Sequence, residues 1–489
     1  MSETAVERFH FIGVGGRAMG AIALALARAG HRVTGSDEGI YEPMSGYLRR
    51  GGIHVAAGYA EGNVGVDAPL VVVGKRVTSD NPELLAVIRR GLRFVSFPQL
   101  LRDRFLTRSR NAVVAGGVGK TTTTAMLAWI LEHAGVRPDY LVGGVARNFP
   151  HAVRFDGRGI AVLEGDEYAS CFDDQTPKFL HYAPEVVVVT NILEDHPDLY
   201  PDVGRLREAF GALVRLLPAD GRLVLSSDDE AVASLSREAA CSVVTTGFRD
   251  GADHPIVDVH FTPQGSGFRL GDARFELPVF GRMNVQNGAM AAVAAAHFGV
   301  SWSQSARALA EFAGVDDRQD GREAGGCTIV TDMASHPHSL GELSHALRQR
   351  YPGRRLISVI QPRATGGRRW IYQRDLPAAL ARFDQVILTS AYEHKPPHRT
   401  GWQSNPFSVE ALAQELQALA VDVTTVPSLP DVPGAVREAV QDGDVVLLSL
   451  REQFVDYRAA VHRALVDRQR AAVLGRTDRS GLLPGVTVA

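Results

Sequence analysis

One short stretch of the chain combines glycines, a lysine and threonines at a spacing suited to binding phosphate. Residues 112–115 are apolar and predict a buried strand, and residues 121–133 place apolar side chains on one face of a helix. The glycines between them allow a tight loop. Its backbone N–H groups and the positive end of the helix dipole would attract an anion. The predicted ATP-binding residues of this loop are Gly116, Gly117, Val118, Gly119, Lys120, Thr121 and Thr122.

The chemistry of this loop depends on two side chains. Lys120 is expected to reach the terminal phosphates of ATP, and the Thr121 hydroxyl is expected to bind Mg²⁺. The loop is a short form of the general motif, because Val114 stands where that motif has its first glycine. The structural alternative is a glycine turn before a polar helix start. We expect Lys120 at an exposed position and no packing role for the threonines of residues 121–124, which favours phosphate binding.

Acidic and histidine side chains follow the next apolar segments. Residues 160–163 and 186–190 predict strands, and these lead to Glu164 and to His196. Ligands of open parallel sheets bind at the carboxyl ends of the strands, so both side chains are expected near the phosphate loop as Mg²⁺ ligands. Each alone has an alternative interpretation as a solvated loop residue.

A second glycine pattern lies near the start of the chain. Residues 9–12 and 31–35 predict strands on either side of a glycine loop and a helix over 18–29, and the second strand ends at an acid. This pattern is typical of sites for NAD, FAD or another diphosphate such as a UDP-sugar, although a purely structural turn also fits it. The predicted UDP-substrate-binding residues are Gly13, Gly15, Gly16, Met19, Ser36 and Asp37. Asp37 has the alternative role of capping the turn.

The remaining pattern predicts three α/β domains and a tail, with boundaries at 1–107, 108–322, 323–470 and 471–489. A strand-rich segment at 256–280 precedes a helix predicted over 288–298. Asn284 and Asn287 lie at the start of that helix and either cap it or contact a base. Further predicted strands are 70–73, 94–96, 222–226, 329–332, 356–360, 385–389 and 445–448.

Composition describes an ordinary globular protein. The 489 residues are 45% hydrophobic and 22% charged, and the net charge of −3 favours neither nucleic acid nor an anionic membrane as a partner. The three scattered cysteines have no metal-ligand spacing and indicate a reducing cytoplasm. The polar N-terminus is no signal peptide, and no apolar run approaches the ~20 residues that span a bilayer. We expect a cytoplasmic monomer or weak homodimer.

The order of these motifs resembles the Mur ligase family over nearly the whole chain. Within the family, the likeness is to the branches that join UDP-N-acetylmuramate to a recycled tripeptide or to L-alanine. The likeness rests on Gly13-x-Gly15-Gly16-x-x-Met19-Gly20, Gly35-Ser36-Asp37, Pro43-Met44-Ser45, Asn81-Pro82, Pro98-Gln99-Leu100-Leu101, Asp166-Glu167-Tyr168 and Lys178-Phe179-x-His181-Tyr182.

The resemblance implies an architecture and a reaction. The architecture is α/β, with an N-terminal Rossmann-like domain, a central P-loop ATPase domain and a C-terminal Rossmann-like domain. Such enzymes activate a carboxylate with ATP and Mg²⁺ as an acyl phosphate, and an amine then attacks it to form an amide. The implied substrates are small molecules: a nucleotide-linked carboxylate, and an amino acid or peptide amine.

The resemblance also assigns roles. Lys120, Glu164, His196 and Arg318 are the implied catalytic residues, and Thr121, Glu164 and His196 the implied metal ligands. Asn284 and Asn287 match the adenine-side pair, and Arg318 and Asp332 match groups that close over the nucleotide. Ser335, His336 and Arg363 are the implied acceptor-side residues.

Several positions depart from the family pattern. Gly117 and Val118 replace Thr and His or Asn, Gly165 replaces alanine, Met283 replaces a His, and Asp317 replaces an arginine. Residues 331–337 have lost an acid, an aromatic residue and a His. These changes cluster around the nucleotide and the acceptor. They leave two alternatives open: a divergent ligase with a non-peptidoglycan substrate, and a catalytically weak nucleotide-binding protein. A dinucleotide-dependent oxidoreductase would leave the phosphate loop unexplained.

Overall fold

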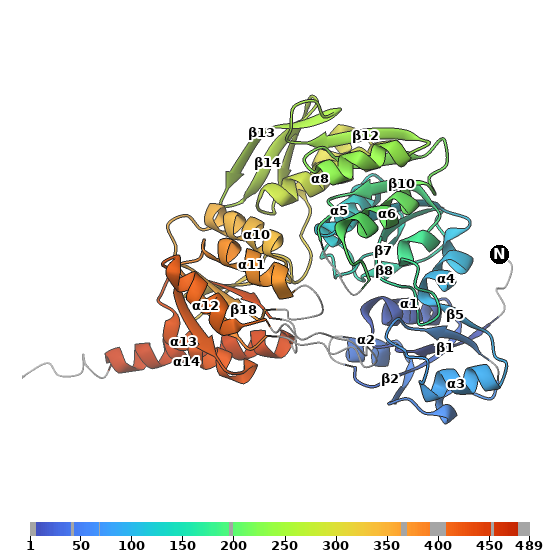
Figure 1. The fold of residues 1–489 in the computed structure, drawn as a ribbon, viewed down its shortest axis with the longest axis horizontal. Coiled ribbons are helices and arrows are strands. Elements are labelled where there is room, and N and C mark those ends of the chain that lie inside the picture. Colours follow the sequence, from blue (N-terminus) through green and yellow to red (C-terminus); the bar gives the residue numbers. More distant parts are fainter. Residues whose placement is uncertain are drawn as a thin grey trace, which may run out of the picture. The chain divides into compact units, whose positions relative to one another are not determined.

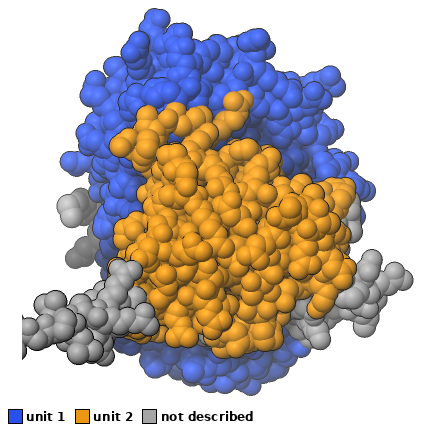
Figure 2. All heavy atoms as spheres, turned by 90° about the vertical axis from the view of Figure 1, so that its left-hand side faces the viewer, with its two compact units in different colours: residues 1–260, 266–278, 283–315 blue, residues 261–265, 279–282, 316–489 orange. Residues whose placement is uncertain are grey.

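A computed structural model of the chain describes residues 6–40, 44–67, 69–194, 199–362, 369–391, 407–450 and 454–477. Within these ranges the chain forms three successive sheets with helices between the strands, so the predicted α/β class is confirmed (Figure 1). The chain divides into two compact units, shown in different colours in Figure 2. The first unit comprises residues 1–260, 266–278 and 283–315, and the second comprises 261–265, 279–282 and 316–489. The predicted domain boundaries stay predictions.

The first sheet is parallel and has the strand order β3-β2-β1-β4-β5. Because the order reverses between β1 and β4, the loops after these two strands flank a topological switch point, where α/β sheets bind ligands. The strands are β1 (Arg8–Ile12), β2 (Arg32–Asp37), β3 (His54–Ala57), β4 (Leu70–Val73) and β5 (Phe94–Ser96). The helices are α1 (Arg17–Arg28), α2 (Met44–Arg50), α3 (Pro82–Arg89) and α4 (Phe97–Leu101).

The second sheet has the order β15-β14-β13-β12-β11-β10-β6-β9-β7-β8. Its centre is parallel, and the antiparallel pairs β7–β8 and β14–β15 lie toward its ends. The strands are β6 (Arg110–Ala115), β7 (Asp139–Leu141), β8 (Val153–Arg154), β9 (Ile160–Glu164), β10 (Pro184–Val189), β11 (Arg222–Ser226), β12 (Ser242–Gly247), β13 (His254–Thr262), β14 (Gly265–Leu270) and β15 (Ala273–Leu277). The helices are α5 (Lys120–His133), α6 (Val203–Val214), α7 (Glu230–Ala233), α8 (Arg282–His297) and α9 (Trp302–Ala310).

The third sheet has the order β16-β17-β21-β18-β19-β20, with only the β16–β17 pair antiparallel among its described strands. Side chains of α10, α11 and α12 pack on one of its faces, and those of α13 and α14 on the other (Figure 1). The strands are β16 (Asp320–Ala324), β17 (Cys327–Thr331), β18 (Leu356–Ile360), β19 (Gln385–Thr389), β20 (Asp422–Val426) and β21 (Val445–Ser449). The helices are α10 (Pro337–Arg350), α11 (Arg369–Leu380), α12 (Val409–Ala418), α13 (Val432–Ala439) and α14 (Phe454–Thr477).

Apolar runs predicted many of the strands, because buried parallel strands are apolar on both faces. The strands β3, β7, β8, β12, β16 and β20 were not predicted. The predicted segments 70–73, 94–96, 222–226, 356–360 and 385–389 coincide with β4, β5, β11, β18 and β19. No helix in the described part of the chain is long and apolar enough to cross a membrane.

Two helix boundaries differ from the prediction. The helix predicted from residue 288 begins at Arg282, after Gly281 at a φ of 90°. Its polar first turns are stabilised by hydrogen bonds that the sequence does not reveal, such as Gln286 Nε2 to Ser226 Oγ at 2.5 Å. At the other end of the chain, α14 continues to Thr477, into the predicted tail, where Ala471 and Ala472 have high helix propensity.

Candidate active site

The phosphate loop connects β6 to α5 at the carboxyl edge of the second sheet. Gly116 and Gly119 have φ values of 136° and 85°, which side chains rarely permit. The neighbouring Asn191 holds the loop from the end of β10: its Oδ1 accepts from Val118 N at 2.9 Å, and its Nδ2 donates to Val118 O at 2.8 Å. Thr190 Oγ1 donates to the same carbonyl at 2.7 Å. The loop is therefore held in shape by side chains of the next strand.

Two departures from the family pattern are explained by close packing. A Cβ atom on Gly117 would lie 3.0 Å from Asn191 Oδ1 and 3.1 Å from Leu193 Cβ. A Cβ atom on Gly165 would lie 2.8 Å from Val113 Cγ1. Larger residues at both positions would require these neighbours to shift, so the two glycines fit their surroundings in this chain.

Lys120 is less exposed than the sequence predicted, with 14% of its side chain accessible. Its ammonium group donates to the carbonyls of Gly116 and Gly117 and lies 2.9 Å from Glu167 Oε2. Burial alone would lower the pKa of Lys120, but the carboxylates of Glu167, Asp166 and Glu164 outweigh it and raise that pKa. Lys120 therefore keeps its positive charge, and Glu167, which sequence reasoning did not assign to the site, is its partner.

The predicted metal ligands Thr121 and Glu164 lie together. Thr121 Oγ1 donates to Glu164 Oε1 at 3.0 Å, and Gly143 N donates to Glu164 Oε2 at 2.8 Å. His196, the third predicted ligand, lies outside the described residues. Among the residues described, no group of three or more His, Cys, Asp or Glu side chains forms a metal site. A hydroxyl and a carboxylate at the start of the phosphate-loop helix are nevertheless the oxygen donors that Mg²⁺ prefers.

The threonine run has a packing role that the sequence did not suggest. Residues 121–124, which include the predicted ATP ligand Thr122, are all buried. Thr124 Oγ1 also donates to the carbonyl of Lys120 at 2.8 Å. The expectation of no packing role is therefore wrong, and the evidence for phosphate binding rests on the loop and on Lys120.

The two asparagines predicted at the nucleotide lie inside α8. Both are buried, and Asn287 Nδ2 donates to Asn284 Oδ1 at 3.1 Å. A Cβ atom on Gly119 would lie 2.5 Å from Asn287 Oδ1, so Asn287 packs directly against the phosphate loop. The structure thus brings Asn287 to the predicted ATP site.

The glycine loop of the first sheet is closed by the end of β2. Gly13 and Val14 donate their N–H groups to Ser36 O at 2.9 and 3.1 Å, and Gly15 N donates to Asp37 Oδ2 at 2.8 Å. Asp37 Oδ1 accepts from Gly39 N at 3.2 Å, which is the turn-capping role left open by the sequence. Asp37 therefore shapes the loop beside α1.

Three other residues predicted to bind the UDP-substrate lie at the start of α1, in the core and at the end of β2. Gly16 precedes α1 as its N-cap residue, whereas Met19 is buried in the core. Ser36 is completely buried, and its hydroxyl donates to Glu83 Oε2 at 2.5 Å. The Ser36 hydroxyl is therefore used inside the protein, and the prediction that Ser36 binds the UDP-substrate stays a prediction.

Glu83 is a buried carboxylate that the sequence analysis did not identify. Besides Ser36, it accepts from Asn63 Nδ2 at 2.5 Å and Ala60 N at 3.2 Å, and His10 Nε2 lies 3.3 Å away. Burial alone would raise the pKa of Glu83, but these hydrogen bonds lower it below its usual value. The network anchors the strand end that shapes the glycine loop.

Two residues predicted to close over the nucleotide, Arg318 and Asp332, belong to the second unit. Asp332 accepts from Gln319 N at 2.9 Å and Ala334 N at 2.7 Å, and burial raises its pKa. Arg318 donates to Asp317 O at 2.9 Å. The structure describes these residues only within their own unit, so the roles of Arg318 and Asp332 at the nucleotide stay predictions.

The predicted amine-binding residues adjoin the start of α10. His336 is the N-cap residue of α10, and its Nδ1 accepts from His338 N at 3.2 Å. Ser335 precedes it and is half-buried, whereas Arg363 lies outside the described residues. The structure therefore gives His336 a helix-capping role beside its predicted role at the acceptor.

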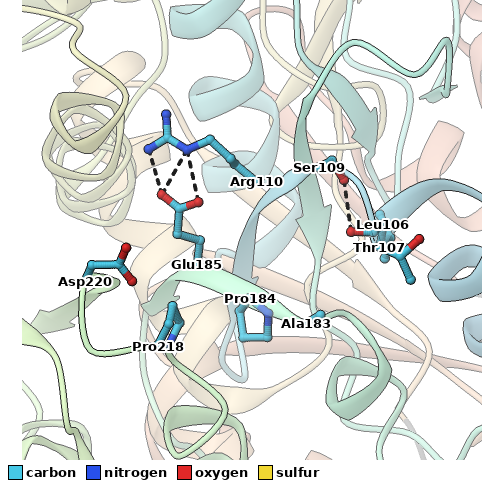
Figure 3. A pocket seen from close by; sticks show the side chains of 9 residues that line it. All are labelled: Leu106, Thr107, Ser109, Arg110, Ala183, Pro184, Glu185, Pro218 and Asp220. Carbon is cyan, nitrogen blue, oxygen red and sulfur yellow. Dashed lines mark hydrogen bonds and ion pairs between the residues drawn. The ribbon is translucent and has the colours of Figure 1, made fainter.

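A hollow of about 560 Å³ lies at the opposite edge of the second sheet, where β6 and β10 begin (Figure 3). Two of its charged residues form an ion pair, with Arg110 2.6 Å from Glu185, and Glu185 also lies 2.7 Å from His297. Ligands of open parallel sheets bind at the carboxyl ends of the strands, whereas this hollow lies where the strands begin. The hollow is therefore not the phosphate site.

Comparison with protein families finds a match to three successive models. Residues 8–107 match the Mur ligase family catalytic domain, 114–296 the Mur ligase middle domain, and 319–449 the Mur ligase glutamate ligase domain.

Individual proteins match over most of the chain. The chain is 32% identical to a UDP-N-acetylmuramate–L-alanyl-gamma-D-glutamyl-meso-2,6-diaminoheptandioate ligase of Escherichia coli (strain K12), over 94% of this chain and 98% of that protein. It is 36% identical to a UDP-N-acetylmuramate–L-alanine ligase of Rubrobacter xylanophilus, over 79% of this chain and 84% of that protein. The crystal structure of a murein peptide ligase from Psychrobacter arcticus matches with a TM-score of 0.71 and 26% identity. The match covers 94% of this chain and 99% of that chain.

Proposed function

The chain belongs to the Mur ligase family of ATP-dependent ligases that form carbon–nitrogen bonds, and from this premise we propose its substrates and the roles of its residues. The proposed acid is UDP-N-acetylmuramate or a closely related nucleotide-linked carboxylate. The proposed amine is an amino acid or a peptide. We also infer action in the cytoplasm, since the three scattered cysteines fit a reducing compartment.

The observation that supports the proposal most strongly is the position of Lys120 in a shaped phosphate loop, with its ammonium nitrogen 2.9 Å from Glu167 Oε2. Transfer of a γ-phosphoryl group to a carboxylate brings two anions together, so positioned positive charge lowers the barrier. Lys120 supplies this charge, and Glu167 together with the loop carbonyls holds its ammonium group in place. Asn191 holds the loop in shape, because its Oδ1 accepts from Val118 N and its Nδ2 donates to Val118 O.

We propose that Thr121 and Glu164 hold Mg²⁺, with His196 as a third ligand. The distance of 3.0 Å between Thr121 Oγ1 and Glu164 Oε1 shows that two oxygen donors meet beside the loop. When bound, Mg²⁺ neutralises phosphate charge and orients the phosphoryl group. Gly143 N fixes the Glu164 carboxylate, and a Cβ atom on Gly143 would lie only 2.5 Å from it.

The acceptor side supports an altered choice of amine. Asp317, which replaces a family arginine, has a φ of 58° and lies 3.1 Å from Arg458 of α14. Its carbonyl accepts from Met333 N at 3.1 Å. The substituted positions 317 and 333 are thus joined by a backbone hydrogen bond, which is why we propose a remodelled acceptor site.

The proposal is tested by incubating the protein with ATP, Mg²⁺, UDP-N-acetylmuramate and single amines, and by following phosphate release together with product mass. We expect phosphate release that depends on both acid and amine, and a product heavier than the acid by the amine minus water. ATP binding without turnover for any amine would favour the nucleotide-binding alternative. Stabilisation in a thermal-shift assay by NAD alone would favour the oxidoreductase.

A further inference from the structure

Gln319, in the second unit, forms hydrogen bonds with both its backbone and its side chain. Its backbone N–H donates to Asp332 Oδ2 at 2.9 Å, and its carbonyl accepts from Arg350 Nη1 at 3.2 Å. Its side-chain amide is bonded twice to the backbone of Phe280. Oε1 accepts from Phe280 N at 3.2 Å, and Nε2 donates to Phe280 O at 3.0 Å. The amide thus pairs with Phe280 as the backbone of a neighbouring β-strand would.

The segment that contains Phe280 is packed closely against α10. Phe280 is buried, and the guanidinium carbon of Arg350 lies 4.1 Å from the centroid of its ring. Gly281 has a φ of 90°, and a Cβ atom on it would lie 2.6 Å from Ala346 Cβ. Residues 279–282 lead directly into α8, the helix with the two asparagines predicted at the nucleotide. The Gln319 side chain is therefore bonded to a segment that is itself fixed.

The backbone on both sides of Arg318 is left-handed. Asp317 and Gln319 have φ values of 58° and 50°, which residues other than glycine rarely adopt. Such conformations persist where surrounding contacts hold them, and they concentrate at functional sites. On one side the contacts are those of Gln319, and on the other the Asp317 carbonyl accepts from Met333 N at 3.1 Å. These contacts fix the direction in which the Arg318 side chain leaves the chain.

We propose that Gln319 is a positioning residue for the ligation: it fixes the turn that carries Arg318 and fastens this turn to the segment before α8. The inference rests on the proposed function, in which Arg318 and Asp332 act at the nucleotide. The turn and the segment adjoin two places where the chain passes between the compact units, at 315–316 and 282–283. An amide is suited to this role, because it offers a donor and an acceptor to one backbone residue.

The experiment compares the wild type with Gln319→Met, Arg350→Met and the double variant. Methionine keeps a side chain of similar length but lacks the amide. Arg348→Met is the matched control, since it removes an arginine of the same helix that is bonded to Asp384 and to the carbonyl of Arg382. We measure kcat with an accepted amine, KM for ATP and for UDP-N-acetylmuramate, and the thermal unfolding of each variant.

Gln319→Met should lower kcat by about 10- to 100-fold, because a small displacement of a catalytic group costs rate. KM for ATP should stay within about twofold of wild type, because uniform binding at the phosphate loop is not altered. The double variant should lose little more than Gln319→Met alone, since Gln319 and Arg350 hold the same turn. Arg348→Met should keep the kcat of the wild type.

Hydrogen exchange followed by mass spectrometry measures the fastening without turnover. The backbone N–H groups of Phe280 and Gln319 should exchange faster in Gln319→Met than in the wild type or in Arg348→Met. Equal exchange in all three proteins would show that the amide does not fasten the two segments.

Two kinetic results would overturn the positioning role alone. One is an unchanged kcat in a Gln319→Met protein that is merely less stable to heat, and the other is additive losses in the double variant. Lack of turnover by the wild type with every amine would instead refute the proposed function, and the positioning role with it. Hydrogen exchange would then still show whether Gln319 holds Phe280.

Discussion

The ammonium nitrogen of Lys120 lies 2.9 Å from a carboxylate oxygen of Glu167, and only 3% of the Glu167 side chain is exposed. Removing the partner of a buried carboxylate strongly destabilises a folded protein, whereas replacing both members of the ion pair costs much less free energy. We therefore expect Lys120 to contribute to the stability of the loop as well as to phosphoryl transfer. The two contributions can be separated by mutation.

Lys120→Met should lower the rate of ATP-dependent turnover by ~10²–10³-fold, because a positioned charge is lost from the transition state. It should also lower the free energy of unfolding by about 3 kcal/mol. In the double variant Lys120→Met with Glu167→Gln, we expect most of the stability to return and the activity to remain low. Urea unfolding and phosphate release measure the two effects. Activity within a few fold of wild type in either variant would show that Lys120 takes no part in phosphoryl transfer.

Asp37→Ala should raise KM for the nucleotide-linked acid by about tenfold and leave KM for ATP nearly unchanged. The reason is that Asp37 holds Gly15 N at 2.8 Å, and loss of a hydrogen bond to a charged group costs about this factor. Asp37→Asn, which keeps an acceptor oxygen, is the conservative control. An equal rise of both KM values would show that the two nucleotide sites are wrongly assigned.

Glu83→Gln should lower the free energy of unfolding by about 1–3 kcal/mol at neutral pH. The substitution replaces an ionised carboxylate, which accepts hydrogen bonds from Ser36 and Asn63, by a neutral amide with only one acceptor oxygen. The pKa of Glu83 is lowered in the folded state, so its ionised form stabilises the protein above the unfolded-state pKa of about 4.3. That stabilisation is lost as the pH falls through the lower folded-state pKa.

The difference in stability between wild type and Glu83→Gln should therefore shrink in acid, as followed by urea unfolding from pH 7 to pH 3. Glu61→Gln is the matched control, since its exposed ion pair with Arg89 contributes little. A difference that stays constant or grows in acid would contradict the role of the Glu83 carboxylate.

The acceptor site should discriminate against the usual amines. Met333 and Ser335 stand where the family has an aromatic residue and a His, and sites built to pair a polar group reject unsuitable ligands by up to ~10⁴-fold. We expect low kcat/KM for L-alanine and for the L-Ala-γ-D-Glu-diaminopimelate tripeptide, and a higher value for another amino acid in a panel. Efficient turnover of either usual amine would show that these substitutions do not alter selectivity.

The sequence predicted the strands that are clear apolar runs and the two glycine loops, because their signals are local. A buried parallel strand is an apolar run, and a tight loop at its end needs glycine. The pairing of Lys120 with Glu167 and of Ser36 with Glu83 was not predicted, since each acid lies 47 residues away from its partner along the chain.

The start of α8 was missed for a related reason. Its first turns are polar, so no apolar periodicity marks them, and they are stabilised by hydrogen bonds such as that from Asn287 to Asn284. Asn191 also had a usable signal, because it directly follows a predicted strand at the ligand-binding edge. Its two hydrogen bonds with Val118 became evident only in the structure.

The central claim is that the acid is activated as an acyl phosphate at the phosphate loop. It is tested most directly with UDP-N-acetylmuramate whose carboxylate oxygens are labelled with oxygen-18, incubated with ATP, Mg²⁺ and an accepted amine. The account predicts that each released phosphate contains one labelled oxygen, because a carboxylate oxygen attacks the γ-phosphorus and leaves with it when the amide forms. Unlabelled phosphate accompanying amide formation would contradict it.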